Sequence, residues 1–260
     1  MRKANLALER LEIFTSLSLL CVNVSKTFLM TCCRVGTPLD VSGQVTLCGN
    51  LVQQVDHLRY LGFYLDCNLA WKCHSDAISS KIARGVGILR GLQHFLPQRI
   101  LLTIYYSLVY PYISYGCLLW SSNFLCNYRR VQVLQNKAVR TIGRYVQDVH
   151  DTCACFRSLK LLNVGQIRDY QAAVFVFQCK NGLTPDVFKN FYQINSDLHN
   201  YGTRQSDNIV ADLRRGTRSS FLMKHLGPSV WNELPLIIRA AEHVPQFKKN
   251  LKDYFLGGIC

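Results

Sequence analysis

Acidic side chains are scarce in this sequence of 260 residues, and no two of them are adjacent. Sixteen Asp and Glu residues stand against 30 Lys and Arg residues, which gives a formal net charge of +14. This excess favours a polyanionic partner, either nucleic acid or an anionic membrane surface, over an uncommitted basic surface. Enzymes that transfer nucleotidyl groups hold two metal ions with closely spaced carboxylates. Because Asp40, Asp56, Asp66 and Asp76 are scattered, we predict no metal site in this chain.

Several motifs of catalysis and nucleotide binding are also missing. The chain has no GxxxxGK(S/T), HExxH or GxSxG segment, which argues against a P-loop, a zinc-protease helix and a hydrolase nucleophile elbow. It has no internal repeat and no low-complexity tract. The sequence therefore offers no catalytic residue that can be recognised from a motif.

Secretion is not expected either. Charged residues such as Glu9 and Arg10 interrupt the N-terminal apolar run, so we predict an intracellular protein, cytoplasmic or nuclear. The twelve cysteines are then expected to be reduced thiols rather than a disulfide framework. The tightest cluster, His150-x-x-Cys153-x-Cys155, lacks the two spaced ligand pairs of a structural zinc site.

The first 66 residues predict one helix and a small antiparallel sheet. Residues 4–17 carry apolar side chains at helical spacing among charges. Residues 22–30 alternate and are rich in β-branched side chains, which predicts a strand. With Gly49-Asn50 as a turn, further short strands are expected at 45–47, 51–55 and 58–65.

From Asn68 onward the apolar spacing becomes helical. A first helix is predicted to end at Leu96-Pro97, and a second begins at Pro97, because proline suits the first turn of a helix. The third spans roughly 127–145. We therefore predict an α+β fold that is mostly α. Later helices are expected at 164–180, 185–192, 228–234 and 244–255, with a turn-rich basic stretch at 195–218.

The stretch from Ile100 to Tyr128 contains no charged residue and is long enough to cross a bilayer. Pro111 lies near its middle, and several tyrosines crowd its centre, whereas spanning helices prefer tyrosine at the membrane interfaces. A buried core helix explains the stretch better, and membrane association is kept as an alternative.

The third helix separates basic from apolar side chains on a helical wheel. Arg130, Lys137, Arg140 and Arg144 form one stripe, here called the basic stripe. No acidic residue is interleaved with it, so it is either a solvated face or a surface that attracts anions. We predict that it binds nucleic acid. Further cations that would widen the footprint are Arg84, Arg90, Arg99, Arg214, Arg215, Arg218, Lys248, Lys249 and Lys252.

Short characteristic segments occur in a consistent order along nearly the whole chain. They include Val22–Thr27, Tyr60-Leu61-Gly62, Leu96-Pro97, Leu134–Arg140, Gly227-Pro228, Trp231-Asn232 and Leu234-Pro235. As an ordered set they resemble the C-terminal part of the reverse transcriptase of jockey-like non-long-terminal-repeat retrotransposons, from the end of the palm through the primer grip and thumb to the C-terminal region.

The resemblance implies three parts. Residues 1–66 would be the remnant of a polymerase palm with the primer-grip hairpin, residues 67–160 a helical thumb, and residues 161–260 a C-terminal helical region. The thumb would follow the phosphates of an RNA template and a DNA primer with the basic stripe. No small-molecule substrate is implied for the chain alone.

The same resemblance assigns roles to single residues. Tyr60, Leu61 and Gly62 would form the primer grip. Lys26 matches a lysine that assists pyrophosphate departure as a general acid, a role open only to an intact enzyme. The intact family enzyme would use Mg²⁺, whereas we expect no cofactor in this chain.

The family's metal-binding aspartates precede the segment matched by residues 23–27, and no Asp-Asp pair occurs in this sequence. We therefore expect a truncated C-terminal portion of an RNA-directed DNA polymerase that incorporates no nucleotide alone but retains a nucleic-acid-binding surface. Two alternatives stay open. One is a stand-alone basic nucleic-acid-binding protein, and the other is a membrane-associated protein held through residues 100–128.

Overall fold

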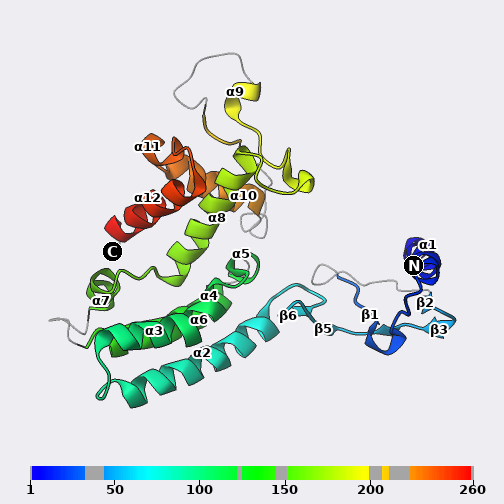
Figure 1. Cartoon of the computed structure of the whole chain (residues 1–260), viewed down its shortest axis with the longest axis horizontal. Coiled ribbons are helices and arrows are strands. Elements are labelled where there is room, and N and C mark those ends of the chain that lie inside the picture. Colours follow the sequence, from blue (N-terminus) through cyan, green and yellow to red (C-terminus); the bar gives the residue numbers. More distant parts are fainter. Residues whose placement is uncertain are drawn as a thin grey trace. The chain divides into compact units, whose positions relative to one another are not determined.

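The computed structural model describes residues 2–32, 44–121, 125–144, 151–198, 207–210 and 223–258. The chain divides into two compact units, Met1–His74 and Ser75–Cys260. The fold is α+β and mostly α, with the strands near the N-terminus and helices through the rest of the described chain, as the sequence predicted (Figure 1). The three-part division at residues 66 and 160 stays a prediction.

The first unit contains a helix, α1 (Arg2–Leu17), a short 3₁₀ turn, η1 (Val24–Lys26), and strands that pair in twos. Two of these ladders are antiparallel, β2 with β3 and β5 with β6, whereas β1 and β4 pair in parallel. Val45, Leu47 and Val52 form its small buried core. The strands are β1 (Phe28–Leu29), β2 (Thr46–Leu47), β3 (Asn50–Leu51), β4 (Gln53–Gln54), β5 (His57–Tyr60) and β6 (Phe63–Asp66).

An aromatic cluster holds the β5–β6 hairpin against the start of the next helix. Phe63 of β6 lies with its ring centroid 5.9 Å from that of Trp71 and 5.3 Å from that of His74. Asp66 is buried, and its two carboxylate oxygens accept the backbone N–H groups of Ala70 (2.8 Å) and Trp71 (2.9 Å). This carboxylate therefore fixes the turn that leads from the strand into the helix.

The second unit begins with a group of helices whose longer members run alongside one another in Figure 1. Gly85 lets two of them approach closely, because a Cβ there would lie 3.0 Å from the Leu108 carbonyl oxygen. Gln135 joins two others, since its fully buried amide donates to the Tyr105 hydroxyl and to the Leu162 carbonyl, both at 2.9 Å. These helices are α2 (Lys72–Leu92), α3 (Gln98–Leu108), α4 (Tyr110–Ser114), α5 (Cys117–Trp120) and α6 (Leu125–Ile142).

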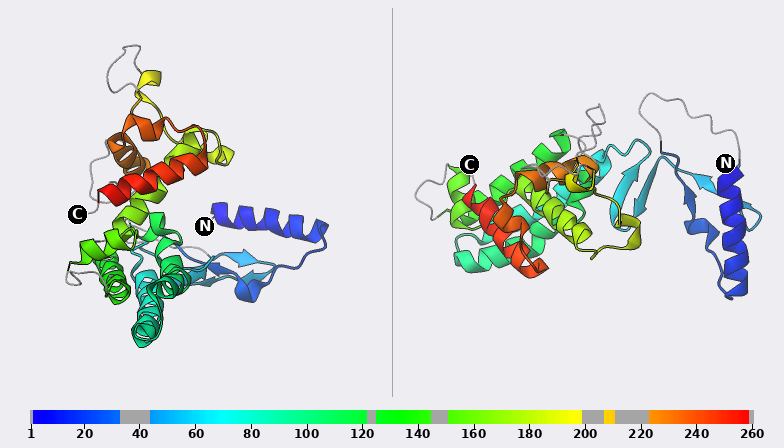
Figure 2. Two further views of the ribbon diagram at one scale, coloured as in Figure 1. Left: turned by 60° about the vertical axis from the view of Figure 1, so that its left-hand side comes forward. Right: turned by 90° about the horizontal axis from the view of Figure 1, so that it is seen from above.

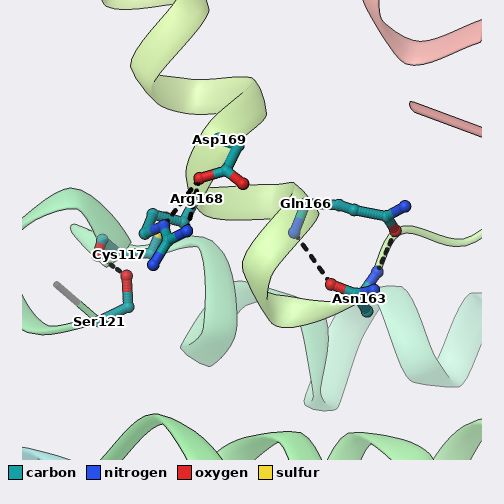
Figure 3. Close-up of polar contacts among 6 residues, drawn as sticks. All are labelled: Cys117, Ser121, Asn163, Gln166, Arg168 and Asp169. Atoms are coloured by element: carbon teal, nitrogen blue, oxygen red, sulfur yellow. Dashed lines mark hydrogen bonds and ion pairs between the residues drawn. The ribbon is translucent and has the colours of Figure 1, made fainter. Parts of the chain in front are cut away.

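Helix α8 (Val164–Lys180) joins this group to the C-terminal helices, because it packs against α4, α5 and α6 as well as α10 and α12. Figure 3 shows the capping box that starts it, in which Asn163 and Gln166 exchange side-chain-to-backbone hydrogen bonds of 2.9 and 3.0 Å. The other described elements of the second unit, which Figure 2 shows from two further directions, are α7 (Thr152–Ser158), η2 (Asp186–Phe188), α9 (Asn195–Leu198), α10 (Met223–Glu233), α11 (Leu236–Arg239) and α12 (Val244–Gly257).

A second core lies between α8, α10 and α12. Phe177 stacks on Phe247 with ring centroids 4.3 Å apart, and Trp231 is buried beside them. The adjoining Asn232 pairs with both backbone groups of Ile209 at 2.9 Å. Two residues that carried the family resemblance, Trp231 and Asn232, therefore have structural roles.

Several predicted elements were wrong in detail. The strand expected at 22–30 is shortened to β1, because the Asn23 side chain accepts the Lys26 N–H and folds the preceding residues into η1. The helix expected at 185–192 is only the single turn η2. Helix α2 ends at Leu92, four residues before the predicted stop. Most of the expected turn-rich stretch at 195–218 lies outside the described residues.

The uncharged stretch 100–128 is not one continuous helix. Val109 separates α3 from α4, and Gly116 at φ 56° separates α4 from α5. Among the helices that the structure describes, none is both long enough and apolar enough to cross a membrane.

Candidate nucleic-acid interface

Helix α6 turns its two kinds of side chain in different directions, as the wheel predicted. Val131, Ala138 and Ile142 are fully buried. Lys137 and Arg140 of the basic stripe are exposed to solvent. The buried face anchors the helix in the second unit, and this anchoring holds the basic face in a fixed orientation.

A groove of about 450 Å³ runs between α6 and α2. Its α2 wall is made of small side chains, Ser79, Ser80 and Ala83. Its α6 wall carries three cations, Arg129, Arg130 and Lys137, together with Val133 and Leu134. Small side chains let an extended backbone approach closely, and the cations would meet its phosphates. We call this feature the basic groove.

Two members of the basic stripe have partners outside their own helix. Arg130 forms an ion pair with Asp76 of α2, and both side chains are about half exposed. Arg144 lies with its Nη1 atom 3.0 Å from Nδ1 of His94. The groove brings Arg130 and Lys137 to one wall, and Arg140 and Arg144 are not among its lining residues. Sequence reasoning missed Arg129 and the whole α2 wall, because no local pattern says which helix pairs with α6.

The predicted primer-grip residues occupy the tip of the β5–β6 hairpin. Leu61 and Gly62 form its two-residue loop, with φ of 47° and 85°. Two consecutive positive φ values are typical of a type I′ turn, and a leucine in the first position is strained. Tyr60 and Leu61 are exposed, at 58% and 70%. The tip therefore presents an aromatic and an apolar side chain to a partner from a rigid support.

Lys26 is exposed at the end of η1, within the segment 22–30 that was predicted to be a strand. Of the further cations, Arg84, Arg90 and Arg99 are exposed on α2 and α3. Lys248, Lys249 and Lys252 are exposed on α12. Arg214, Arg215 and Arg218 lie outside the described residues.

The carboxylates of the described chain do not fit a magnesium clamp. Both oxygens of Asp66 already accept backbone N–H groups, and Asp76 pairs with Arg130. No group of three or more His, Cys, Asp or Glu residues in the described ranges could hold a metal ion. Asp40 and His150 fall outside those ranges. We therefore derive no metal-dependent step for this chain.

Comparison with known proteins places this geometry in context. The chain is 32% identical over 124 residues to a "Probable RNA-directed DNA polymerase from transposon BS" of Drosophila melanogaster. It is similar in part to a transposon RNA-directed DNA polymerase. The match covers 46% of this chain but only 14% of the relative's length. No family model matches the chain, and no solved structure matches it.

Proposed function

We propose that this chain binds the sugar–phosphate backbone of nucleic acid in the basic groove between α2 and α6. The observation that carries the proposal is the gathering of Arg129, Arg130 and Lys137 on one wall of a groove whose other wall is made of small side chains. Cationic side chains would recognise the charge of the phosphates and not the bases. Binding should therefore depend weakly on base sequence and steeply on salt concentration. The partial similarity to a transposon RNA-directed DNA polymerase supports nucleic acid as the anion.

Within this proposal the segment 67–160 acts as a thumb-like element of a reverse transcriptase of the jockey kind. The basic groove follows an RNA template paired with a DNA primer, and the β5–β6 hairpin tip of Tyr60, Leu61 and Gly62 contacts the primer end. The exposure of that tip and its support by Phe63 and the start of α2 favour a contact role. Lys26 is the general acid only where another segment supplies metal-binding carboxylates.

Neutralising one groove cation at a time tests the binding surface. With a labelled DNA duplex, the plot of log affinity against log salt should lose about 0.9 in slope for each phosphate contact removed. Lys137→Gln is expected to produce this change, because Lys137 is exposed and lines the groove. Lys189→Gln removes an exposed lysine elsewhere in the second unit and serves as the matched control. Equal slopes for the two variants would show that the groove is an ordinary solvated face.

The ion pair between Arg130 and Asp76 allows a test in which binding is expected to become tighter rather than weaker. Asp76 neutralises Arg130 in the free protein and would compete with a phosphate for it. Asp76→Asn should therefore tighten nucleic-acid binding by roughly two- to fivefold, the value of an exposed ion pair. Fluorescence anisotropy at constant salt measures the change. Weaker binding by Asp76→Asn would contradict the placement of the phosphates at this wall.

Catalysis by the chain alone is not part of the proposal. A primer-extension assay with the purified chain, Mg²⁺ and an annealed RNA–DNA template should give no product above that of a heat-treated control. The physical reason is that the described residues contain no group of three or more His, Cys, Asp or Glu that could hold a metal ion, and that Asp66 and Asp76 already have hydrogen-bond and ion-pair partners. Template-dependent incorporation would overturn this expectation.

A further inference from the structure

A second cavity, of about 190 Å³, lies away from the basic groove, between α3, the start of α4, the loop before α8, α8 itself and α12. Four tyrosines line it together with two lysines, and leucine and isoleucine side chains complete the wall. We call it the tyrosine pocket. Its polar lining residues are Tyr105, Tyr106, Tyr110, Tyr170, Lys160 and Lys252.

Three of the four phenol rings, those of Tyr105, Tyr106 and Tyr110, form one packed group. The ring centroids of Tyr106 and Tyr110 lie 5.3 Å apart, and those of Tyr105 and Tyr106 lie 5.5 Å apart, both in edge-to-face orientation. Tyr105 is fully buried, and its hydroxyl accepts the Gln135 amide at 2.9 Å while keeping its own proton to donate. Burial raises the pKa of Tyr106, Tyr110 and Tyr170 above 10.0, so these hydroxyls stay protonated donors at neutral pH.

The two ammonium groups reach the pocket from distant segments. Lys252 comes from α12, and Lys160 follows α7. Lys160 has φ of 51°, in the left-handed region, with its N–H bonded to the Arg157 carbonyl at 3.0 Å. Glycine is the usual residue at such a helix end, so a lysine there accepts backbone strain. Both lysines are exposed and line the same small cavity, so an anion held there would interact favourably with both ammonium groups.

We propose that the tyrosine pocket binds one unpaired nucleotide, with its base against the tyrosine rings and its phosphate between Lys160 and Lys252. The cavity is smaller than the pockets that take drug-sized ligands, which suits a single base. Aromatic faces accept any base by stacking, and phenol hydroxyls donate to its carbonyl oxygens. The inference rests on the proposed nucleic-acid binding and adds to it a preference for a strand with an unpaired nucleotide.

The pocket can be tested on the full chain with four probes. These are uridine monophosphate, uridine, inorganic phosphate and a labelled single-stranded oligonucleotide, with a blunt duplex for comparison. Lys160→Gly removes one ammonium group and suits the positive φ, and Lys252→Gln removes the other. Lys249→Gln changes an exposed lysine of the same helix that does not line the pocket, and Lys137→Gln reports on the basic groove.

We expect Lys160→Gly and Lys252→Gln each to weaken binding of the monophosphate by about tenfold, the effect of losing one charge-assisted hydrogen bond. Lys249→Gln should leave monophosphate binding unchanged, whereas Lys137→Gln should change duplex binding in the basic groove. If the pocket accepts a nucleotide only as part of an oligonucleotide, the pocket variants should instead lower the ratio of single-strand affinity to duplex affinity. Either pattern supports the proposal.

Three results would overturn it. Phosphate could bind as tightly as the monophosphate, which would mean a plain anion site. Wild-type protein could bind neither the monophosphate nor the single strand in preference to duplex. Pocket variants could also match wild type on every probe. In each case duplex binding that still responds to Lys137→Gln leaves the proposed function standing, whereas loss of duplex binding by wild-type protein removes that function separately. A Tm within a few degrees of wild type shows that each variant is folded.

Discussion

The two compact units use apolar side chains differently. Among the described residues, the core of the first unit buries three hydrophobic side chains, whereas the core around α8, α10 and α12 in the second buries eleven. At the end of α1 and in the turn after it, the first unit instead exposes Leu17, Leu19 and Leu20, at 60 to 95%. The first unit therefore depends on a small apolar core, one aromatic cluster and local hydrogen bonds, whereas the second has a much larger packed core.

The largest loss should come from the core of the second unit. Trp231→Ala removes a buried indole beside Phe247 and leaves a cavity, which should lower the free energy of unfolding by about 3–5 kcal/mol. Urea unfolding followed by far-ultraviolet circular dichroism measures the change. Phe95→Ala removes a side chain that is 81% exposed, and its stability should stay near that of wild type. Equal effects of the two changes would contradict the assigned core.

A smaller loss is expected in the first unit. Leu47→Ala deletes a fully buried side chain, but the small core around it can collapse, so the cost should be about 2 kcal/mol. Hydrogen exchange should accelerate at Thr46–Leu47 and Asn50–Leu51, and protection of α8 should be unchanged. Faster exchange in α8 as well would show that the two units unfold together, and the comparison would then fail.

Alkaline pH should act on the second unit. Burial raises the pKa of the Cys117 thiol from 9.0 to about 12, and its Sγ donates to Gln171 Oε1 at 3.0 Å. A folded-state pKa above the unfolded value contributes stability that is complete below pH 9 and is lost as pH rises toward 12. Between pH 8 and pH 10 the loss from this one group should be about 1.4 kcal/mol. Cys117→Ala should flatten the pH dependence measured by urea unfolding, and an unchanged slope would exclude this thiol as its source.

The smallest change is a gain. Leu61→Gly relieves a leucine at φ 47° in the hairpin loop and should stabilise the β5–β6 hairpin by up to about 1 kcal/mol. Hydrogen exchange of His57–Tyr60 and Phe63–Asp66 should slow. The same variant should weaken primer binding if the exposed Leu61 side chain contacts nucleic acid. If Leu61→Gly made hydrogen exchange of the hairpin faster and left primer binding unchanged, the strained Leu61 would have neither of these two effects.

Helices with a clear period were predictable from sequence, whereas segments controlled by one side chain were not. Residues 164–180 matched α8, because Asn163 caps it and an apolar period runs through it. Residues 22–30 looked like a strand, but the Asn23 side chain accepts from the Lys26 N–H and turns the chain. This side-chain-to-backbone hydrogen bond between residues three positions apart overrides the strand propensity of the segment, and amino-acid composition does not reveal it.

The candidate site shows the same division. A helical wheel drawn at 100° per residue predicted the orientation of the basic stripe. The exposure of Lys137 and Arg140 agrees with that wheel. The groove needed the partner helix α2, and the contact that reveals it joins Asp76 to Arg130, 54 positions apart in the chain. The tyrosine pocket likewise needs α12 to bring Lys252 to the cavity that Lys160 also lines. Long-range pairings of this kind depend on tertiary packing, which a single sequence does not specify.

Asp66 has a practical meaning for anyone shortening this chain. The division between the two units falls inside the first turn of α2, and the turn that begins this helix is tied by a carboxylate six residues ahead of Lys72. A fragment started at Ser75, where the second unit formally begins, would discard that tie together with Trp71 and His74. An expression fragment intended to keep α2 intact should therefore start upstream of the β5–β6 hairpin, at a residue before His57.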